Sequence, residues 1–408
     1  MHKNKPAKKE VKKDRKEPLG LMEPLLIASD SPHRQELADL TLELAAVSSG
    51  LKRSLPAGVL RALSELVRAM NCYYSNLIEG HNTHPVDIER ALKKEFNKED
   101  REKRNLQREA TAHIEVQRWI DEGGIKGRVQ TLESIQEIHR KFGKYLPEEL
   151  LWVEDPDTKK RLKVIPGELR SHDVKVGRHF AISPGAVPRF LKRYEEVYEN
   201  LGKSEMLLAA AAAHHRLLWI HPFLDGNGRV ARLVSHAMLS EILETGSLWS
   251  IARGLARNEA AYKQHLIACD AKRRGDLDGR GNLSEEALAQ FTKFFLKTCI
   301  DQVRFMESLV QPNRLRDRIL LWAEEEMRAD NLPSGSGLLL EAILFRGEIE
   351  RGETGKILGL SARSARRIIS VLIRRGIFAA DSHKAPLRLA FPAALAERWM
   401  PGLFPPQT

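Results

Sequence analysis

The segment His221–Arg232 (H-P-F-L-D-G-N-G-R-V-A-R) brings several chemically capable side chains together within twelve residues. Gly226 and Gly228 flank an asparagine, so the backbone can turn tightly there and point several N–H groups at one anion. Arg229 and Arg232 are three residues apart and therefore share one face of the helix that this segment opens. Two guanidinium groups on one face can hold a polyphosphate in a way that lysines would not. The segment therefore predicts a phosphate-binding loop.

Two other side chains of this segment suit chemistry on a phosphate. Asp225 adds a carboxylate beside the loop, which is a usual way to hold Mg²⁺ together with substrate phosphates. His221 starts the loop, and the ordinary pKa of histidine suits a general base near neutral pH. A histidine before a proline is more often structural, and a Gly-Asn-Gly alone is a turn, but their combination favours a catalytic site. A P-loop is excluded because no Gly-Lys-Ser/Thr follows a predicted strand.

Here the sequence resembles the Fic family, whose signature is His, any residue, Phe, any residue, Asp or Glu, Gly-Asn-Gly-Arg, two residues and Arg. Residues 221–232 match this signature at every specified position. The resemblance runs from Ser75 to about Leu296. It implies a helical Fic core that transfers AMP from ATP to a Ser, Thr or Tyr hydroxyl of a protein target. Gly228 favours AMP transfer over phosphorylation, because a sister branch of the fold has a bulkier residue there and binds the nucleotide in reverse.

The resemblance also implies roles for individual residues of the loop. His221 would deprotonate the target hydroxyl, Asp225 would hold Mg²⁺ on the phosphates of ATP, and Phe223 would pack inward. The residues that would bind the phosphates are Gly226, Asn227, Gly228, Arg229 and Arg232. The two arginines would contact the β and γ groups. These roles agree with phosphoryl transfer in general, where catalysis is mostly positioning and charge neutralisation.

A second part of the nucleotide site is expected on residues 156–184, which are rich in Gly, Pro and β-branched residues and predict a hairpin or extended flap among helices. In the family such a flap contacts the nucleotide and aligns the target backbone by strand addition. The flap residues that would bind nucleotide are Val176, Gly177, Arg178 and His179. Asn258 or Tyr262, at the start of a later helix, would touch the adenine. For all of these positions, loop geometry, helix capping or packing is an equally open explanation.

Glu79 stands at the end of a predicted amphipathic helix that Gly80 terminates. A carboxylate there faces the negative end of the helix dipole, which costs about 0.3–1 kcal/mol without a compensating cation. Ser75, Glu79 and Gly80 resemble the family's inhibitory motif: Ser or Thr, three residues, Glu, and Gly or Asn. The resemblance implies that Glu79 pairs with Arg232 and occupies the cation meant for the γ-phosphate. Ser75, one helical turn earlier, would help to orient Glu79.

The segment from Leu338 to Trp399 predicts helix, helix, tight turn, helix and two short strands around 381–386, the pattern of a winged helix-turn-helix domain. Ser361 would cap the third helix, whose apolar residues point inward. The arginines that would face outward near the start of this helix are Arg363, Arg366 and Arg367. Between residues 360 and 389 there are seven basic residues and one acid, which suits contact with DNA phosphates. Winged helices also serve protein interaction or dimerisation, so a homodimer stays open.

The length of 408 residues exceeds one ordinary core and predicts two or three domains. The run of predicted helices, together with the resemblance, predicts a mainly α fold with a short β-hairpin flap. The predicted division is a disordered basic tail at 1–22, an N-terminal helical region with the inhibitory helix at 23–122, a Fic catalytic domain at 123–310, and a linker helix with the winged helix-turn-helix domain at 311–400. The first seventeen residues hold eight Lys or Arg against three acids, which favours a solvated tail.

The chain carries a net charge of +11, which agrees with a nucleic-acid partner, although part of the excess lies in the tail. Its three cysteines are few and widely spaced, which argues against a disulfide framework or a zinc site and indicates a cytoplasmic protein. No apolar run reaches the length of a membrane span.

Two other functions use the same features as the adenylyltransferase. The first is a DNA-binding transcriptional regulator whose Fic-like module only senses nucleotide, which the arginine-rich helix favours. The second is a de-AMPylase, which removes AMP from a modified protein with the same loop while Glu79 orients a water molecule.

Overall fold

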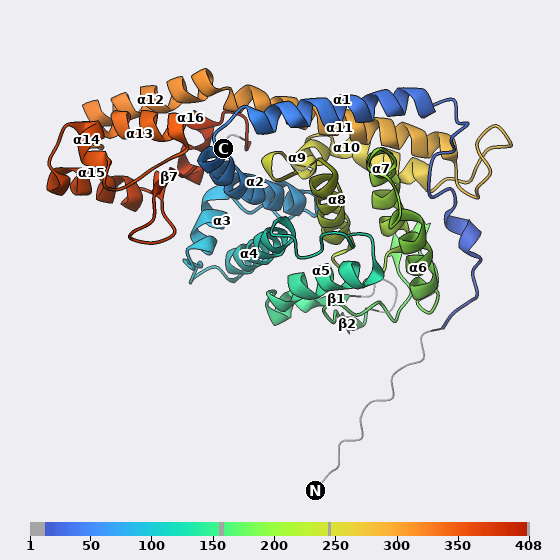
Figure 1. Cartoon of the computed structure of the whole chain (residues 1–408). Helices are drawn as coiled ribbons and strands as arrows, with labels where there is room; N and C mark the ends of the chain where they lie inside the picture. Colours follow the sequence, from blue (N-terminus) through green and yellow to red (C-terminus); the bar gives the residue numbers. More distant parts are fainter. Residues whose placement is uncertain (1–12, 155–158, 244–245, 406–408) are drawn as a thin grey trace, which may run out of the picture. The chain divides into compact units, whose positions relative to one another are not determined.

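The computed structural model describes residues 13–154, 159–243 and 246–405. Residues 1–12 of the predicted basic tail lie outside these ranges. The described chain is mainly helical, as predicted, with a few short antiparallel strands (Figure 1). Within these ranges no helix is both long and apolar enough to cross a membrane.

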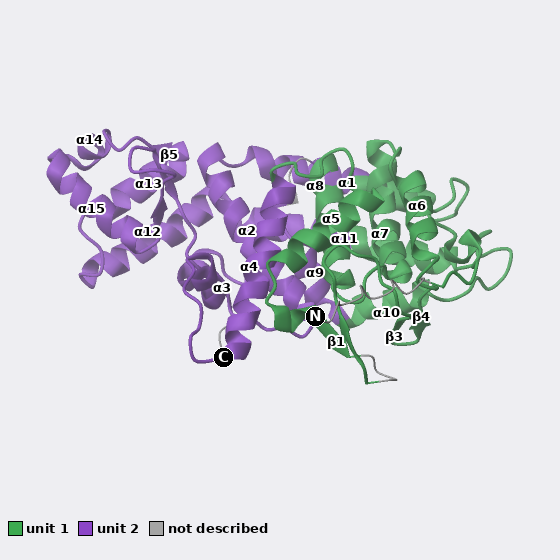
Figure 2. Ribbon diagram, turned by 90° about the horizontal axis from the view of Figure 1, so that it is seen from below, with its two compact units in different colours: residues 1–41, 122–242, 260–296 green, residues 42–121, 243–259, 297–408 purple. Residues whose placement is uncertain are grey.

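The chain divides into two compact units, which Figure 2 shows in different colours. Unit 1 comprises residues 1–41, 122–242 and 260–296, and unit 2 comprises residues 42–121, 243–259 and 297–408. The units therefore interleave along the sequence, whereas the predicted domains followed one another. The predicted loop at 221–232 belongs to unit 1, and the stretch Ser75–Gly80 belongs to unit 2.

Unit 1 consists of helices with two small hairpins. Its elements are η1 (Leu19–Met22), α5 (Leu132–Lys144), η2 (Glu148–Leu151), β1 (Trp152–Glu154), β2 (Arg161–Lys163), β3 (Lys175–Val176), β4 (His179–Phe180), α6 (Val187–Tyr198), α7 (Lys203–Ile220), α8 (Asn227–Leu243) and α10 (Glu259–Cys269). Helices α1 (Arg34–Arg53) and α11 (Glu285–Val310) are divided between the two units, and α8 and α10 each have one terminal residue, Leu243 and Glu259, in unit 2.

Helix α7 is buried on almost every side, because five consecutive alanines, Ala209–Ala213, let its neighbours approach closely. Helix α6 packs against it, and Figure 1 shows the two helices side by side. The sequence also predicts a helix over residues 132–144, and helix α5 has these bounds. The hydroxyl oxygen of Thr131 caps its start by accepting a hydrogen bond from the Ser134 N–H at 3.1 Å.

The predicted flap region contains two separate antiparallel hairpins. Strand β1 pairs with β2, and β3 pairs with β4, with Val176 opposite His179. Gly177, between β3 and β4, has φ +58°, the left-handed conformation that a tight connection favours in glycine. The hairpin with the predicted nucleotide-binding residues is therefore β3–β4.

The described part of the predicted basic tail, residues 13–22, contacts unit 1. The Glu17 carboxylate accepts hydrogen bonds from the Ser183 N–H at 2.8 Å and from its hydroxyl at 2.7 Å. Arg189 donates to the Glu17 carbonyl at 3.2 Å, and Met22 is fully buried. These ten residues therefore do not form the solvated tail that the composition predicts, because they contact unit 1.

Unit 2 contains the remaining helices and a three-stranded sheet. Its elements are α2 (Ala57–Ile78), α3 (Pro85–Leu92), α4 (Arg101–Asp121), η3 (Gly246–Leu248), α9 (Ile251–Arg257), α12 (Pro312–Arg328), α13 (Ser336–Arg346), β5 (Glu348–Ile349), α14 (Thr354–Leu358), α15 (Ala362–Arg374), β6 (Phe378–Ala379), β7 (Leu387–Leu389), η4 (Ala393–Leu395) and α16 (Ala396–Trp399). Helix α2 packs against α3, α4 and α9.

Helix α2 ends where the sequence predicts. Gly80 has φ +85°, and its N–H donates to the Leu77 carbonyl at 3.0 Å, while the His81 N–H donates to the Asn76 carbonyl at 2.9 Å. This left-handed glycine ending satisfies carbonyls of the last turn. Glu79 is the C-cap residue. The Tyr74 hydroxyl, one turn earlier, donates to the Leu403 carbonyl at 3.0 Å and so joins the C-terminal segment to α2.

The C-terminal region has the order α13, β5, α14, α15, β6, β7, with the strands arranged β5-β7-β6 in one antiparallel sheet. The turn before α15 forms as predicted: Gly359 has φ +64°, and the Ser361 hydroxyl accepts from the Ser364 N–H at 3.3 Å. The apolar residues of α15 point inward, since Ile368, Ile369 and Leu372 are buried. Residues 381–386 connect β6 to β7 and form neither strand.

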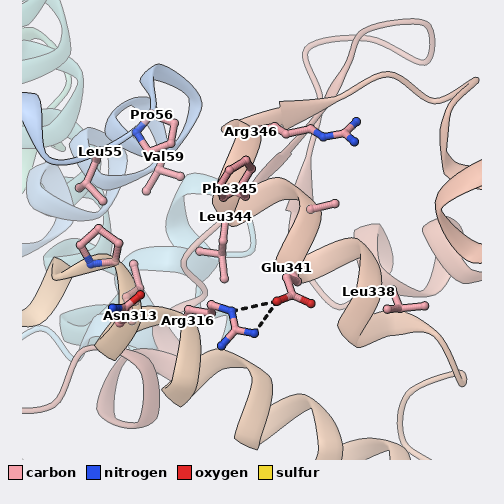
Figure 3. A pocket seen from close by; sticks show the side chains of 13 residues that line it. Leu55, Pro56, Val59, Asn313, Arg316, Leu338, Glu341, Leu344, Phe345 and Arg346 are labelled. Carbon is pink, nitrogen blue, oxygen red and sulfur yellow. Dashed lines mark hydrogen bonds and ion pairs between the residues drawn. The ribbon is translucent and has the colours of Figure 1, made fainter.

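A cavity of about 480 Å³ lies within unit 2, lined by residues of α2, α12 and α13 and the segment before α2 (Figure 3). Arg316 donates from Nε to Glu341 at 2.9 Å across this lining, and Phe345 beside it is 85% exposed. None of the residues that the sequence singles out for chemistry lines this cavity.

Candidate active site

The predicted loop joins α7 to α8, and its backbone conformation is unusual at both ends. His221 follows the last residue of α7 and has φ 51° and ψ 64°, a left-handed conformation that costs a residue with a Cβ about 1–2 kcal/mol. Gly226 has φ +81°, and α8 begins at the next residue. The N-terminal N–H groups of α8 therefore belong to the loop, as a phosphate site requires.

Asn227 closes this loop from inside. Its Nδ2 donates to the Phe223 carbonyl and its Oδ1 accepts from the Phe223 N–H, both at 2.9 Å. The side chain is buried, with 4% of the residue exposed. The amide that was predicted to bind phosphate thus fixes the loop backbone, because it satisfies two main-chain groups four residues earlier. Phe223 itself is fully buried, which confirms that it packs inward.

A buried histidine of α5, His139, packs against Phe223 of the loop. The ring of His139 stacks on Phe223 with centroids 3.8 Å apart and planes 7° apart. Its Nδ1 accepts a hydrogen bond from the Gly167 N–H at 2.8 Å, so the ring proton is on Nε2, and the backbone of Asp225 also interacts with this ring. Burial lowers the pKa of His139 to about 4. Sequence reasoning missed this residue, although its place among the apolar residues of α5 was a possible signal.

Asp225 and Arg229 form an ion pair. Arg229 Nη2 lies 2.8 Å from Asp225 Oδ2, and the side chains are 7% and 43% exposed respectively. The Arg229 guanidinium also lies over the Phe142 ring, 5.1 Å from its centroid. The predicted Mg²⁺ ligand and one predicted phosphate ligand are thus brought together.

The donor set at Asp225 fits one kind of metal. The described residues contain no group of three or more His, Cys, Asp or Glu side chains that could hold an ion by themselves. Mg²⁺ is commonly bound by one or two carboxylates together with substrate phosphates and water. A single half-exposed carboxylate beside a phosphate loop suits Mg²⁺ that arrives with a nucleotide.

His221 is neutral in this environment. Burial lowers its pKa to about 4, and the positive charge of Arg170 adds to this effect. Its Nδ1 lies 3.3 Å from the Leu218 carbonyl, which places the proton on Nδ1 and leaves Nε2 as a proton acceptor. The pKa is lower than the near-neutral value that the residue type suggests, because the imidazole is desolvated beside a cation.

A buried chain of hydrogen bonds connects Tyr262 of α10 through His214 of α7 to Ser235 of α8. The Tyr262 hydroxyl donates to His214 Nε2 at 2.7 Å, and His214 Nδ1 donates to the Ser235 hydroxyl at 2.8 Å, which donates to the Ala231 carbonyl at 2.9 Å. Burial, and then the charge of Arg232, lower the pKa of His214 to about 3. Tyr262 is 2% exposed, so its hydroxyl serves this chain rather than the predicted contact with adenine.

The remaining predicted residues occupy three environments. On the flap, Val176, Gly177 and Arg178 are exposed, whereas His179 Nε2 bonds to the Trp219 carbonyl at 2.8 Å and so attaches the hairpin to α7. Asn258 belongs to unit 2, where its amide donates to the Gly254 carbonyl at 2.9 Å and caps α9. The other predicted residues of unit 2 are buried Ser75 and exposed Glu79, Gly80, Arg363, Arg366 and Arg367.

A sequence profile of the Fic/DOC family matches residues 130–239, which include α5, the flap, α7, the loop and most of α8. The chain carries a Fic domain. Curated relatives named "Protein adenylyltransferase Fic" match as well. The protein from Drosophila willistoni is 28% identical over 218 residues, and the alignment covers 51% of this chain and 41% of that protein. The protein from Drosophila ananassae is 34% identical over 111 residues, which cover 27% of this chain and 19% of that one.

Solved structures of Fic proteins share the fold. A Fic family protein from Desulfovibrio desulfuricans superimposes with a TM-score of 0.53 at 16% identity, covering 90% of this chain and 98% of that one. Residues 134–508 of Fic-1 from C. elegans give a TM-score of 0.50 at 16% identity, covering 68% and 74% of the two chains. The chain spans less than half the length of the curated relatives it matches, so the similarity centres on the Fic domain.

Proposed function

We propose that this protein is an adenylyltransferase that moves AMP from ATP to a Ser, Thr or Tyr hydroxyl of a protein target. The observation that carries this proposal is the loop itself. A neutral histidine, a carboxylate, two buried arginines and the start of a helix meet within residues 221–232, in a Fic domain. The name of the curated relatives supports the same reaction.

The proposed reaction is one in-line displacement. His221 Nε2 takes the proton of the target hydroxyl, whose oxygen attacks the α-phosphorus of ATP as the bond to the pyrophosphate breaks. The N–H groups at the start of α8, with Arg229 and Arg232, hold the phosphates and neutralise the charge of the departing pyrophosphate. The flap residues Val176 to His179 would line the nucleotide and the target backbone.

Mg²⁺ belongs to this proposal, because ATP brings phosphate oxygens to the Asp225 carboxylate. When bound, the ion would neutralise charge on the phosphates and fix their geometry. Asp225 would then exchange part of its pairing with Arg229 for the ion, and Arg229 would turn to phosphate oxygens. Adenine contacts by Asn258 or Tyr262 are not part of the proposal, since both side chains have other hydrogen bonds.

We also propose that the activity is inhibited by Glu79, which would pair with Arg232 with the help of Ser75. The sequence motif carries this part of the proposal, together with the glycine-terminated helix end that presents Glu79. An Arg–carboxylate pair gains bidentate geometry but loses hydration, so its net stability need not be large. A bias of about 2.7 kcal/mol already holds the active state near one per cent.

The decisive experiment incubates the purified Glu79→Gly protein with ATP, Mg²⁺ and a lysate, followed by mass spectrometry of the modified proteins. We expect peptides that carry AMP on a hydroxyl, many more than with the wild type, and none with the Glu79→Gly/His221→Ala double variant. A folded, nucleotide-binding Glu79→Gly protein that modifies neither itself nor any other protein would refute the transferase.

The same reagents test removal of AMP. A target modified beforehand by the Glu79→Gly protein is incubated with wild type and with Glu79→Gly. Loss of AMP only with wild type would indicate a de-AMPylase in which Glu79 orients water, and persistence in both would dismiss this alternative.

The C-terminal region favours a second, separate activity. We propose that residues 336–389 form a winged helix-turn-helix domain that contacts DNA phosphates, because its three helices and last two strands follow the predicted order and because three arginines near the start of α15 are exposed: Arg363, Arg366 and Arg367. A protein-interaction or dimerisation surface is the competing use of the same face. The salt dependence of DNA binding, described below, separates them.

A further inference from the structure

A buried arginine that the sequence did not single out, Arg170, lies between the flap hairpin and the loop of the Fic domain. Its Nε donates to the His221 carbonyl at 2.7 Å, and its own backbone N–H donates to the Pro222 carbonyl at 2.9 Å. Its Nη1 donates to the His172 carbonyl at 3.0 Å, and its Nη2 donates to the Ile182 carbonyl. One residue thus joins both ends of the β3–β4 segment to the start of the loop.

The burial of this guanidinium is costly. Arg170 is 1% exposed, and the hydrogen-bond partners just named are neutral carbonyls. These carbonyl dipoles stabilise its positive charge, but none of them neutralises it. Desolvation lowers its pKa to about 10, so it stays charged at neutral pH. An apolar side chain could fill such a site at lower cost in free energy. A buried cation at this place therefore argues for a use beyond stability.

The carbonyl that Arg170 holds belongs to the residue in the least favourable backbone conformation of the loop. His221 adopts φ 51° and ψ 64°, and a strained residue of this kind persists only where its surroundings fix it. We propose that Arg170 is a positioning residue that keeps the His221 imidazole aimed at the target hydroxyl and couples the flap to it. This inference rests on the proposed adenylyltransferase function.

The charge of Arg170 acts on His221 in addition to its hydrogen bonds. The charged and titratable groups that face the imidazole are Arg170 and His179, which disfavour its protonation, and Asp225, which favours it. Geometry and charge can be separated by substitution. Lysine keeps the positive charge but replaces a planar fork of five N–H donors with a single ammonium group, whereas glutamine removes the charge.

The test compares Arg170→Lys and Arg170→Gln, each combined with Glu79→Gly. We expect kcat for AMP transfer to fall about 100-fold in both, the size of effect that follows a misplacement of about 1 Å, with little change in KM for ATP. The titration of the His221 ring, followed by NMR of its Cε1–H, should move to higher pH in Arg170→Gln and stay low in Arg170→Lys.

Arg216 provides the matched control. It is also fully buried in unit 1, and it donates to the Pro24 carbonyl from Nε at 3.1 Å and from Nη2 at 2.8 Å, away from the flap and the loop. Arg216→Gln should lose thermal stability as Arg170→Gln does, but keep its kcat and the titration of His221. If the two glutamine variants match in stability, kcat and titration, Arg170 is only structural and the inference is wrong.

The NMR titration needs no activity and keeps the inference distinct from the proposed function. If the Glu79→Gly protein transfers no AMP, the proposed function fails, while the position of the His221 titration in the Arg170 variants still reports whether this arginine sets its environment. An unchanged titration in a folded Arg170→Gln protein would overturn the electrostatic part, and an unchanged kcat in Arg170→Lys the geometric part.

Discussion

Two pairs of arginines have the same spacing near the starts of their helices but different environments. Arg229 and Arg232 in α8 are 6% and 4% exposed, whereas Arg363 and Arg366 in α15 are exposed. Arg229 is held by the Asp225 carboxylate and by the Phe142 ring. An exposed arginine keeps its hydration and costs little to retain, but a buried one must have partners. The first pair therefore belongs to a fixed site, and the second only defines a charged surface.

The difference shows that a spacing of three residues specifies the shared helix face but not the burial of the side chains. It places two guanidinium groups on one face of a helix in both cases. Burial depends on what other parts of the chain bring against that face. In α8 the Asp225 carboxylate and the Phe142 ring of α5 lie against Arg229, whereas Arg363 and Arg366 on α15 are exposed.

The largest effect should come from lowering the pH, which acts on the buried site. Burial lowers the pKa of four histidines of unit 1 to about 4 or about 3: His139, His214, His215 and His221. Their unfolded pKa is 6.5, so below it the unfolded chain binds protons that the folded chain does not. The free energy of unfolding should therefore fall as the pH drops from about 6.5 to about 4, by up to about 1.4 kcal/mol per pH unit for each histidine.

Urea unfolding at several pH values measures this dependence. A His139→Gln variant, which is compared with itself across the same pH values, should show a smaller slope because it lacks one of these groups. A free energy of unfolding that is constant over this range would contradict the buried, neutral state of the histidines.

The next effect concerns the two arginine pairs directly. In the Glu79→Gly protein, Arg229→Ala and Arg232→Ala should each lower kcat/KM for AMP transfer about 100- to 1000-fold, the usual cost of removing one group that stabilises charge in a transition state. Arg363→Ala and Arg366→Ala serve as matched variants and should leave kcat/KM almost unchanged. Comparable losses in both pairs would mean that exposure does not distinguish their roles.

The sequence predicted those features that depend on neighbours along the chain. The bounds of α5, the end of α2 at Gly80 and the inward face of α15 follow from periodicity and capping, and each is confirmed. The hydrogen bonds of Asn227 are also local, since they join it to the backbone of Phe223 four residues earlier, but the resemblance implied only a contact with phosphate.

The parts that sequence missed depend on distant segments. Arg170 lies 51 residues before the carbonyl it holds at His221, and His139 is brought under the loop by the packing of a separate helix. The Tyr262 hydroxyl bonds to a histidine 48 residues away. Charge or polarity alone suggests exposure for such residues, so only the fold reveals that they are buried.

Two asparagines extend the comparison between the loop and unit 2. Asn227→Ala should lower the free energy of unfolding by about 2–3 kcal/mol, because both the N–H and the carbonyl of Phe223 lose a buried partner. Asn258→Ala removes a single bond to the Gly254 carbonyl and should cost about 1 kcal/mol, with KM for ATP unchanged. Denaturant unfolding and steady-state kinetics measure both. A raised KM for ATP in Asn258→Ala would restore the adenine contact that the sequence suggested.

The smallest effect on stability should come from the α15 surface. The triple variant Arg363→Ala/Arg366→Ala/Arg367→Ala should change the free energy of unfolding by less than about 0.5 kcal/mol, because the three side chains are exposed.

If α15 binds DNA phosphates, the dependence of log affinity on log salt should become shallower in this triple variant by roughly 0.9 for each phosphate that the variant no longer neutralises. Fluorescence anisotropy with duplex DNA over a salt series measures this slope. Arg328→Ala, which removes an arginine whose side chain is 79% exposed on α12, is the control for a general decrease in positive charge. An equal slope in the triple variant and the wild type would assign this face to protein interaction or dimerisation, which sedimentation of the two proteins would then distinguish by a difference in mass.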